Sequence, residues 1–454
     1  MNQFTLCLLL TLGFAMANDD APKSAGHDQG RIITDMPRIL PWAERTEVVN
    51  RLLQDRLTNL LPRLMRETGL DMWVIINREY NEDPVYLTLV PEPAFAARRT
   101  TMLILFDRGG DKGVERITVS RYPIGGMYEP KWGGGTIDSQ WQRLSEVIAE
   151  RNPKRIGINT SRHWPVADGL TKALHQRLME VLTPELKDRL ETAEDLAIRW
   201  LETRSEAELE IYPQIVAIAR AVISEAFSNK VVTPGVTTTQ EVAAYIRQRF
   251  SDLGLPIWFQ PSVSVQRQER VEDATSPFFG TSGIIRRGNI LHTDVGITYL
   301  RLNTDTQEMG YVLKPGENDV PEGLKRALAV GNRWQDILAD QYRTGRTGNE
   351  ILAATREKAD REGILCSVYT HPLGNFGHAP GPTIGMWDNQ GPTPIRGEWK
   401  LQPNTAYAIE GNVKVKVPEW NNRYVQIMLE QDAVFDGSRV LFMGGRQTRW
   451  HLVY

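Results

Sequence analysis

Five side chains that can bind metals stand in or beside apolar, strand-like segments in the C-terminal half of the chain: Asp294, Asp305, His371, Glu410 and Glu430. A charged carboxylate in a buried strand is costly unless a partner neutralises it. Four carboxylates and one imidazole together suit two divalent cations. The sequence therefore predicts a dinuclear metal centre. Hard oxygen ligands with a single imidazole favour manganese, cobalt or zinc over copper or an iron–sulfur cluster, and affinity alone does not choose among the three. We expect two divalent ions, Mn²⁺ first, with Co²⁺ or Zn²⁺ as alternatives.

The two aspartates lie eleven residues apart in ILHTDVGITYLRLNTDTQE. We expect residues 289–300 and 302–313 to pair as antiparallel strands around a turn near Tyr299 and Leu300, with Asp294 opposite Asp305. Opposed residues lie about 4.5–5.5 Å apart, and two bare carboxylates repel at that distance. Either aspartate alone is typical of a turn or a surface. The apolar residues on both sides favour the metal interpretation.

His371 and His378 lie seven residues apart in a stretch, 370–385, that is rich in Gly and Pro. Such a stretch cannot be the interior of a helix, and it predicts a shaped loop. Glu410 follows the apolar run AYAI and Glu430 follows VQIML, so we expect both at the ends of strands. A single histidine or glutamate would indicate little, but the combination with the aspartate pair indicates a site.

In order and spacing these residues resemble the pita-bread metallopeptidases, which include aminopeptidase P, prolidase, methionine aminopeptidase and creatinase. The family's Asp-x-Gly strand is matched by Asp294 with Gly296, and the later ligands follow in the same order. The resemblance implies that Asp294, Asp305, His371, Glu410 and Glu430 bind the metals, with Asp305 and Glu430 bridging both ions. It also implies catalytic roles for Glu410, as the proton shuttle, and for His378, which would steady the substrate carbonyl or the oxyanion.

The resemblance implies an α+β fold in which a pita-bread catalytic domain, a curved antiparallel sheet with helices, spans residues 201–454. Segments 205–227 and 232–254 resemble the first two helices of that domain, the second of them initiated by Pro234-Gly235. A creatinase-like or prolidase-like α/β domain is expected over residues 39–200, because 60–76, 100–106, 115–121 and 154–160 alternate an amphipathic helix with apolar strands. A chain of 454 residues is long enough for two cores.

Three positions depart from the family. Relatives that act on proline peptides commonly carry a histidine well before the first ligand, whereas residues 271–291 contain none. The nearest, His292, lies two residues before Asp294 on the same strand face, and we expect it to support the ligands. Met428 stands where an arginine is common, and Ala379 where an acidic residue is common. These departures leave the substrate preference open.

The net charge and the N-terminal segment limit the partners and the cellular location that we expect. A net charge of −3, from 53 basic and 56 acidic residues, argues against nucleic acid and favours a small peptide substrate. Residues 1–17 read as a signal peptide, with an apolar run and the cleavage site Ala15-Met16-Ala17, followed by a polar leader over 18–38. The protein is thus expected in the periplasm or secreted, without stable membrane insertion. No basic residue precedes the run, so an uncleaved anchor is the alternative.

Two ions that share one water would lower its pKa, and the resulting hydroxide could attack an amide carbonyl. The resemblance favours an Xaa-Pro aminopeptidase that releases the N-terminal residue of a peptide. A prolidase-type Xaa-Pro dipeptidase comes second. A creatinase-like non-peptide hydrolase, an esterase or organophosphate hydrolase, and a metal-free binding module are further alternatives. Family members often pair, so a homo-oligomer is possible. Trp387, Trp399 and Trp420 could line a proline pocket, although tryptophans are more often core residues.

Overall fold

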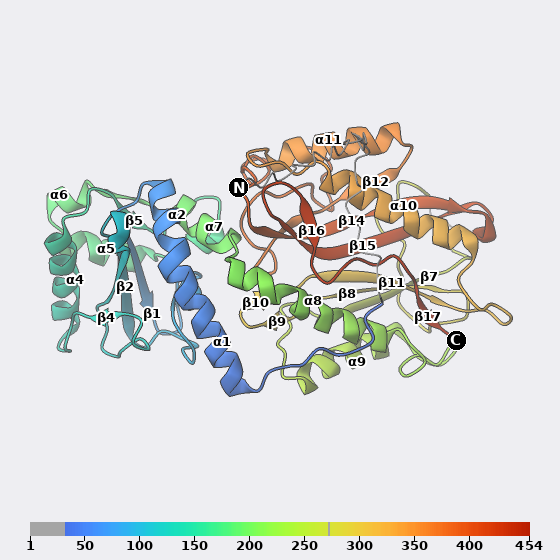
Figure 1. Cartoon of the computed structure of the whole chain (residues 1–454), viewed down its shortest axis with the longest axis horizontal. Coiled ribbons are helices and arrows are strands. Elements are labelled where there is room, and N and C mark those ends of the chain that lie inside the picture. Colours follow the sequence, from blue (N-terminus) through green and yellow to red (C-terminus); the bar gives the residue numbers. More distant parts are fainter. Residues whose placement is uncertain (1–31, 271–272) are drawn as a thin grey trace, which may run out of the picture.

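The computed structural model describes residues 32–270 and 273–454. The expected signal peptide and most of the polar leader lie outside the described residues, so export stays a prediction. Within the described residues the strands form a six-stranded sheet and, later in the chain, a nine-stranded sheet and a two-stranded sheet of β9 and β10 (Figure 1). No helix in 32–270 or 273–454 combines the length and the apolar composition needed to cross a bilayer.

The six-stranded sheet has the order β4-β3-β2-β1-β5-β6 and is covered by helices on both faces. Strand β1 pairs antiparallel with β2 and parallel with β5. Alternate side chains of β1 enter two cores: Trp73 and Ile75 pack with α1, α2 and α7, whereas Val74 and Ile76 pack with α4 and α5. The strands are β1 Met72–Arg78, β2 Thr100–Asp107, β3 Val114–Thr118, β4 Glu129–Pro130, β5 Ile156–Ile158 and β6 Leu190–Thr192; the helices are α1 Trp42–Asp55, α2 Leu61–Thr68, α4 Ile137–Arg151, α5 Lys172–Val181 and α7 Glu194–Glu202.

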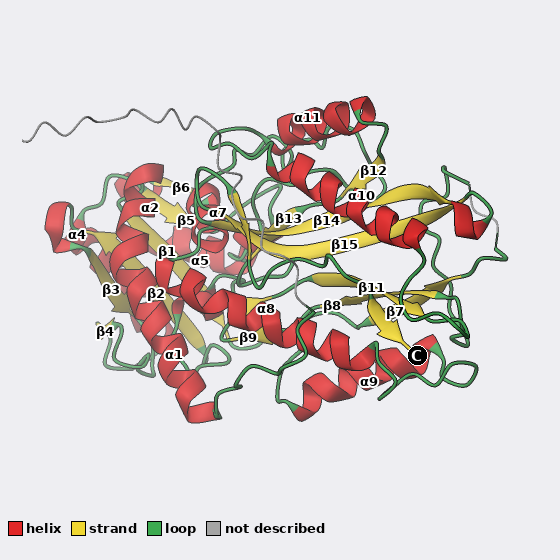
Figure 2. Cartoon of the chain, turned by 45° about the vertical axis from the view of Figure 1, so that its right-hand side comes forward, coloured by secondary structure: helices red, strands yellow, loops and turns green. Residues whose placement is uncertain are grey.

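The nine-stranded sheet has the order β12-β14-β15-β11-β8-β7, with β13 beside β14, β16 beside β15 and β17 beside β11. Its pairs are antiparallel except for β11 with β17. Together with its helices, this sheet confirms the α+β class (Figure 2). The strands are β7 Ser262–Gln266, β8 Ile290–Val295, β11 Thr306–Val312, β12 Leu365–Val368, β13 His371–Leu373, β14 Thr405–Val417, β15 Arg423–Phe435, β16 Val440–Phe442 and β17 His451–Val453.

Four helices pack on this sheet: α8 (Glu206–Ala226) on β11, α9 (Thr239–Asp252) on β7, α10 (Glu322–Ala339) on β14 and β15, and α11 (Gly348–Arg361) on β12. Capping boxes begin α8 at Ser205, α9 at Thr238 and α11 at Thr347. The two predicted helices are present, but Pro234 and Gly235 lie in the turn before α9 and do not start it. The expected domain boundary after residue 200 falls within the last turn of α7 and stays a prediction.

The predicted aspartate hairpin exists, but its register is wrong by two residues. Each expected strand is interrupted: β8 is followed by β9 (Thr298–Tyr299), and β10 (Leu302–Asn303) precedes β11. The turn lies at Leu300 and Arg301, one residue later than expected, with φ of 53° and 64°. Asp294 therefore pairs with Gln307 and not with Asp305.

Candidate metal centre

One row of side chains crosses four neighbouring strands of the nine-stranded sheet. Asp294 on β8 pairs with Gln307 on β11, Gln307 pairs with Glu430 on β15, and Glu430 pairs with Glu410 on β14. Paired residues of antiparallel strands project from the same face. Asp305 precedes Gln307 by two residues and joins that face. The row therefore brings three carboxylates and one amide together, with a fourth carboxylate beside them.

Three of the expected local positions are wrong. Glu410 and Glu430 lie inside 13-residue strands and not at strand ends, because apolar side chains continue on the opposite face of β14 and β15. His371 lies on the short strand β13, where it pairs with Ala408 of β14. The Gly-rich loop begins only after β13, and it carries His378. Long-range pairing thus extends strands through segments whose local composition suggested ends or loops.

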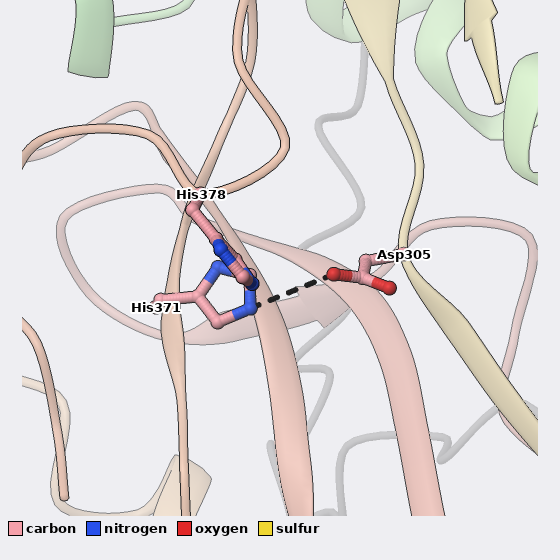
Figure 3. Close-up of side chains that lie close together, drawn as sticks. All are labelled: Asp305, His371 and His378. Carbon is pink, nitrogen blue, oxygen red and sulfur yellow. Dashed lines mark ion pairs between the residues drawn. The ribbon is translucent and has the colours of Figure 1, made fainter. Parts of the chain in front are cut away.

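The five predicted ligands converge. His371 Nε2 lies 3.6 Å from Asp305 Oδ2, 3.8 Å from Glu430 Oε1 and 3.9 Å from Glu410 Oε2 (Figure 3 shows the first pair). Oxygen atoms of Asp294, Asp305 and Glu430 lie within 4.8 Å of one another. A segment of some 140 residues thus contributes every member of one cluster.

The donor set fits divalent cations, since several lone pairs in the cluster have no hydrogen-bond partner. Asp294 Oδ1, His371 Nε2 and Glu430 Oε1 are buried and unpartnered. His371 Nδ1 donates to the carbonyl of Pro372 at 3.1 Å, so its Nε2 carries the lone pair that faces the carboxylates. Buried polar atoms normally find a partner. Unpartnered acceptors that share one space are what a bound cation would satisfy.

The electrostatics agree with this fit. Burial raises the pKa of Asp294 to about 7. Burial, followed by the neighbouring carboxylates, raises the pKa values of Asp305, Glu410 and Glu430 well above their usual range. Burial also lowers the pKa of His371 to about 3, so its imidazole is neutral, as a metal ligand must be. Positive charge within the cluster would relieve the repulsion among the carboxylates.

The cluster opens toward His378. This side chain is exposed, and its ring centroid lies 4.5 Å from that of His371 (Figure 3). The ring centroid of Trp258 lies 5.1 Å from that of His378. Glu410 is also partly exposed, at 18% of its side chain. Tyr369 stands beside both histidines. Glu410 and His378 are therefore both accessible from solvent.

The aromatic residues at the site differ from the tryptophans that the sequence suggested. Trp420 is 3% exposed and belongs to the core under α10, and Trp399 packs edge-on against Trp164 at 5.8 Å. Trp387 is exposed. The three do not gather into a proline pocket. The sequence analysis missed Trp258 and Gln307, which lie at the cluster.

The comparisons with known proteins give a family and a fold. The family model described as "Metallopeptidase family M24" matches residues 210–436, half of the chain. The fold resembles the X-Pro aminopeptidase from Thermotoga maritima, with 17% identity, a TM-score of 0.61, and coverage of 86% of this chain and 100% of that one. The search of curated proteins gives no match.

Two further solved structures share the fold over most of both chains. The Xaa-Pro dipeptidase from Bacillus anthracis is 16% identical, with a TM-score of 0.57 and coverage of 90% of this chain and 99% of that one. The His350Ala form of Escherichia coli aminopeptidase P is 12% identical, with a TM-score of 0.54 and coverage of 88% and 94%. At these identities the likeness shows the fold.

Proposed function

The chain belongs to metallopeptidase family M24, and on that premise we propose that it is a dinuclear-metal Xaa-Pro aminopeptidase that removes the N-terminal residue of a peptide. The observation that carries the proposal is the convergence of four carboxylates and a neutral imidazole around unpartnered lone pairs. A binding module would have no use for this charge, which is costly to bury without cations.

The proposed ligands are those that the sequence predicted: Asp294, Asp305, His371, Glu410 and Glu430. Two divalent ions, Mn²⁺ first, would lower the pKa of a coordinated water and supply a nucleophile near neutral pH. Glu410 Oε1 accepts a hydrogen bond from Gln307, which leaves Oε2 free toward the site. In the proposal Glu410 Oε2 takes the proton of the attacking water and passes it to the leaving amine. His378 donates to the carbonyl oxygen as negative charge develops there.

The proline preference rests on the fold relatives and on amide chemistry. The similar structures are titled as X-Pro aminopeptidase, Xaa-Pro dipeptidase and aminopeptidase P. A proline on the leaving side makes a tertiary amide without an N–H, which a dedicated site has to accommodate. Xaa-Pro dipeptidase activity is the second candidate, because the Bacillus anthracis dipeptidase is covered as fully as the aminopeptidase.

The test compares the tripeptide Ala-Pro-Ala with the dipeptide Ala-Pro. Protein stripped with a chelator should be inactive, and added Mn²⁺ should restore release of alanine from the tripeptide. Glu430→Gln should lower kcat/KM by about a hundredfold or more, since even partners of metal ligands account for about 10–100-fold. Glu362→Gln is the matched control, because Glu362, at the end of α11, forms a surface pair with Arg333 of α10.

The outcomes separate the alternatives. Cleavage of the dipeptide alone would favour the prolidase-type activity. Metal-loaded protein that cleaves neither peptide would refute the Xaa-Pro proposal and direct attention to non-peptide substrates. Protein that binds no metal after exposure to Mn²⁺ would favour the metal-free binding module.

A further inference from the structure

A buried glutamine occupies the centre of the carboxylate row. Gln307 is 7% exposed, and its strand position lies between Asp294 on β8 and Glu430 on β15. Its side-chain nitrogen donates to Glu410 Oε1 at 2.7 Å and to Glu430 Oε2 at 2.8 Å. Both amide protons are therefore used by carboxylates from two different strands. Gln307 contacts two proposed ligands without adding charge.

The orientation of this amide follows from its neighbours. An ionised carboxylate only accepts hydrogen bonds, so the nitrogen of Gln307 must face the glutamates and its oxygen must point away. That oxygen, Oε1, lies 2.8 Å from His292 Nε2. An amide oxygen also only accepts, so His292 must carry its proton on Nε2. Its Nδ1 is then an acceptor, 3.5 Å from the hydroxyl of Ser264.

The network leaves specific oxygens free. One oxygen of each glutamate is held by Gln307, and the other, Glu410 Oε2 or Glu430 Oε1, lies within 4 Å of His371 Nε2. Rotation of either carboxylate would break a bond to the amide. Reversal of the amide would set its oxygen against two carboxylates and its nitrogen against the N–H of His292. The hydrogen bonds from His292 to Gln307 and from Gln307 to the glutamates therefore permit one orientation of the two carboxylates.

We propose that Gln307 is a positioning residue that holds the carboxylates of Glu410 and Glu430 in the orientation that turns one oxygen of each toward the metal ions, and that His292 acts through it. The inference rests on the proposed function only in taking the cluster as a site for divalent cations. It explains why His292 and Gln307 are both buried beside the ligands although neither reaches the cation space with a free lone pair. Gln307 also holds two like charges together, since it donates to both at once.

The first test measures Mn²⁺ binding by calorimetry, independently of any peptide. Gln307→Met keeps the approximate length and removes both donors, and it should weaken binding of at least one Mn²⁺ by about 10–100-fold. Gln140→Met is the matched control: Gln140 is also buried and donates to two acceptors, the carbonyls of Thr100 and Val119, but it lies on α4, beside the six-stranded sheet. Affinity of Gln307→Met within twofold of the wild type overturns the proposal.

Coupling between the two residues gives the second test. His292→Phe should weaken Mn²⁺ binding in the wild-type background and add no further loss in the Gln307→Met background, because its effect passes through the amide. Additive losses would show that His292 acts independently of Gln307 and would overturn that part of the proposal.

A third measurement needs no substrate and is made on protein loaded with diamagnetic Zn²⁺, which keeps the carboxylates ionised. In protein labelled with ¹⁵N-histidine, NMR should show His292 as the Nε2–H tautomer, with a signal assigned by its absence in His292→Phe. Gln307→Met should shift this signal as the acceptor is lost, while Gln140→Met leaves it unchanged. An Nδ1–H tautomer in the wild type would overturn the proposal.

Wild-type protein that binds Mn²⁺ and cleaves neither peptide would refute the proposed function alone, and wild-type protein that binds no divalent ion would overturn both.

Discussion

At the scale of single residues, two glycines make room for the tryptophan beside the cluster. A Cβ atom on Gly296 or on Gly377 would lie 2.2 Å from an atom of the Trp258 indole, far inside contact distance. The indole Nε1 donates to the carbonyl of Thr304 at 2.8 Å, so the ring cannot easily withdraw. Glycine is therefore required at position 296, in the Asp-x-Gly segment, and at position 377, next to His378, because the indole lies too close to the backbone for a Cβ atom.

We predict that Gly377→Ala displaces Trp258 and, with it, the ring of His378. The overpacking should destabilise the protein by about 1–3 kcal/mol, and kcat/KM for Ala-Pro-Ala should fall more than stability alone explains. Thermal melting and steady-state kinetics measure the two effects. Gly133→Ala is the control, since a Cβ atom there meets no neighbour within 4 Å. Wild-type kinetics in Gly377→Ala would refute the role given to Trp258.

At the scale of secondary-structure elements, one buried cluster joins α8, β11 and β17. Arg220 Nε donates to Glu308 Oε1 at 2.6 Å, and His451 Nε2 contacts Glu308 Oε2. Burial opposes the ionisation of Glu308, but Arg220 and His451 outweigh it and hold the pKa of Glu308 at about 2. Glu308 follows Gln307 on β11, so the cluster anchors the strand that crosses the metal site.

We predict that Glu308→Gln destabilises the protein by about 3–5 kcal/mol at pH 7, because it removes the carboxylate of a buried ion pair. The folded pKa lies below the ordinary value of 4.5, so the ionised form stabilises the fold above that pH. This contribution is lost as the pH falls toward 2. The difference in unfolding free energy between wild type and variant should therefore shrink with acidification. Urea unfolding at several pH values measures it.

The control for this prediction is Glu191→Gln, since Glu191 forms an exposed pair with Arg155. Exposed pairs contribute about 0–1 kcal/mol. A loss in Glu308→Gln that is no larger than in the control, or one that is independent of pH, would contradict the prediction.

At the scale of the whole molecule, the aspartate hairpin reaches across to the N-terminal part of the chain. From the turn between β9 and β10, Arg301 donates to the carbonyls of Leu87 and Val90, at 2.7 and 2.6 Å, and pairs with Glu92 at 2.9 Å. The same hairpin continues into β8 and β11, which carry Asp294 and Gln307. The contacts of Arg301 with residues 87–92 therefore stabilise the strands of the metal site.

We predict that Arg301→Ala destabilises both the segment 86–92 and the hairpin between β8 and β11. Hydrogen–deuterium exchange should rise in residues 86–92 and in residues 296–305, because the carbonyl acceptors and the turn lose a shared partner. Arg361→Ala is the control, as Arg361 forms an exposed pair with Glu357 on α11. An increase in exchange that is confined to residues 86–92 would show that the hairpin is stable without the contacts of Arg301.

Sequence alone predicted the five candidate ligands and their order, the family, the α+β class, the helices α8 and α9, and apolar strands such as β1, β2 and β8. These follow from residue chemistry and from apolar periodicity, which are local properties. Asp294, Asp305, His371, Glu410 and Glu430 could be named because a carboxylate within an apolar run, or a histidine in a Gly-rich stretch, is visible in the sequence itself.

Only the tertiary structure decided the register that places Gln307 in the row. The turn at Leu300 and Arg301 has two residues with positive φ, a geometry that normally takes Asn or Gly. Contacts of Arg301 with residues 87–92, and packing of Leu300 against the core under α8, hold it there. A shift of one residue in the turn moves each partner by two positions. Because distant contacts set the turn, no local pattern could show that an amide lies opposite Asp294.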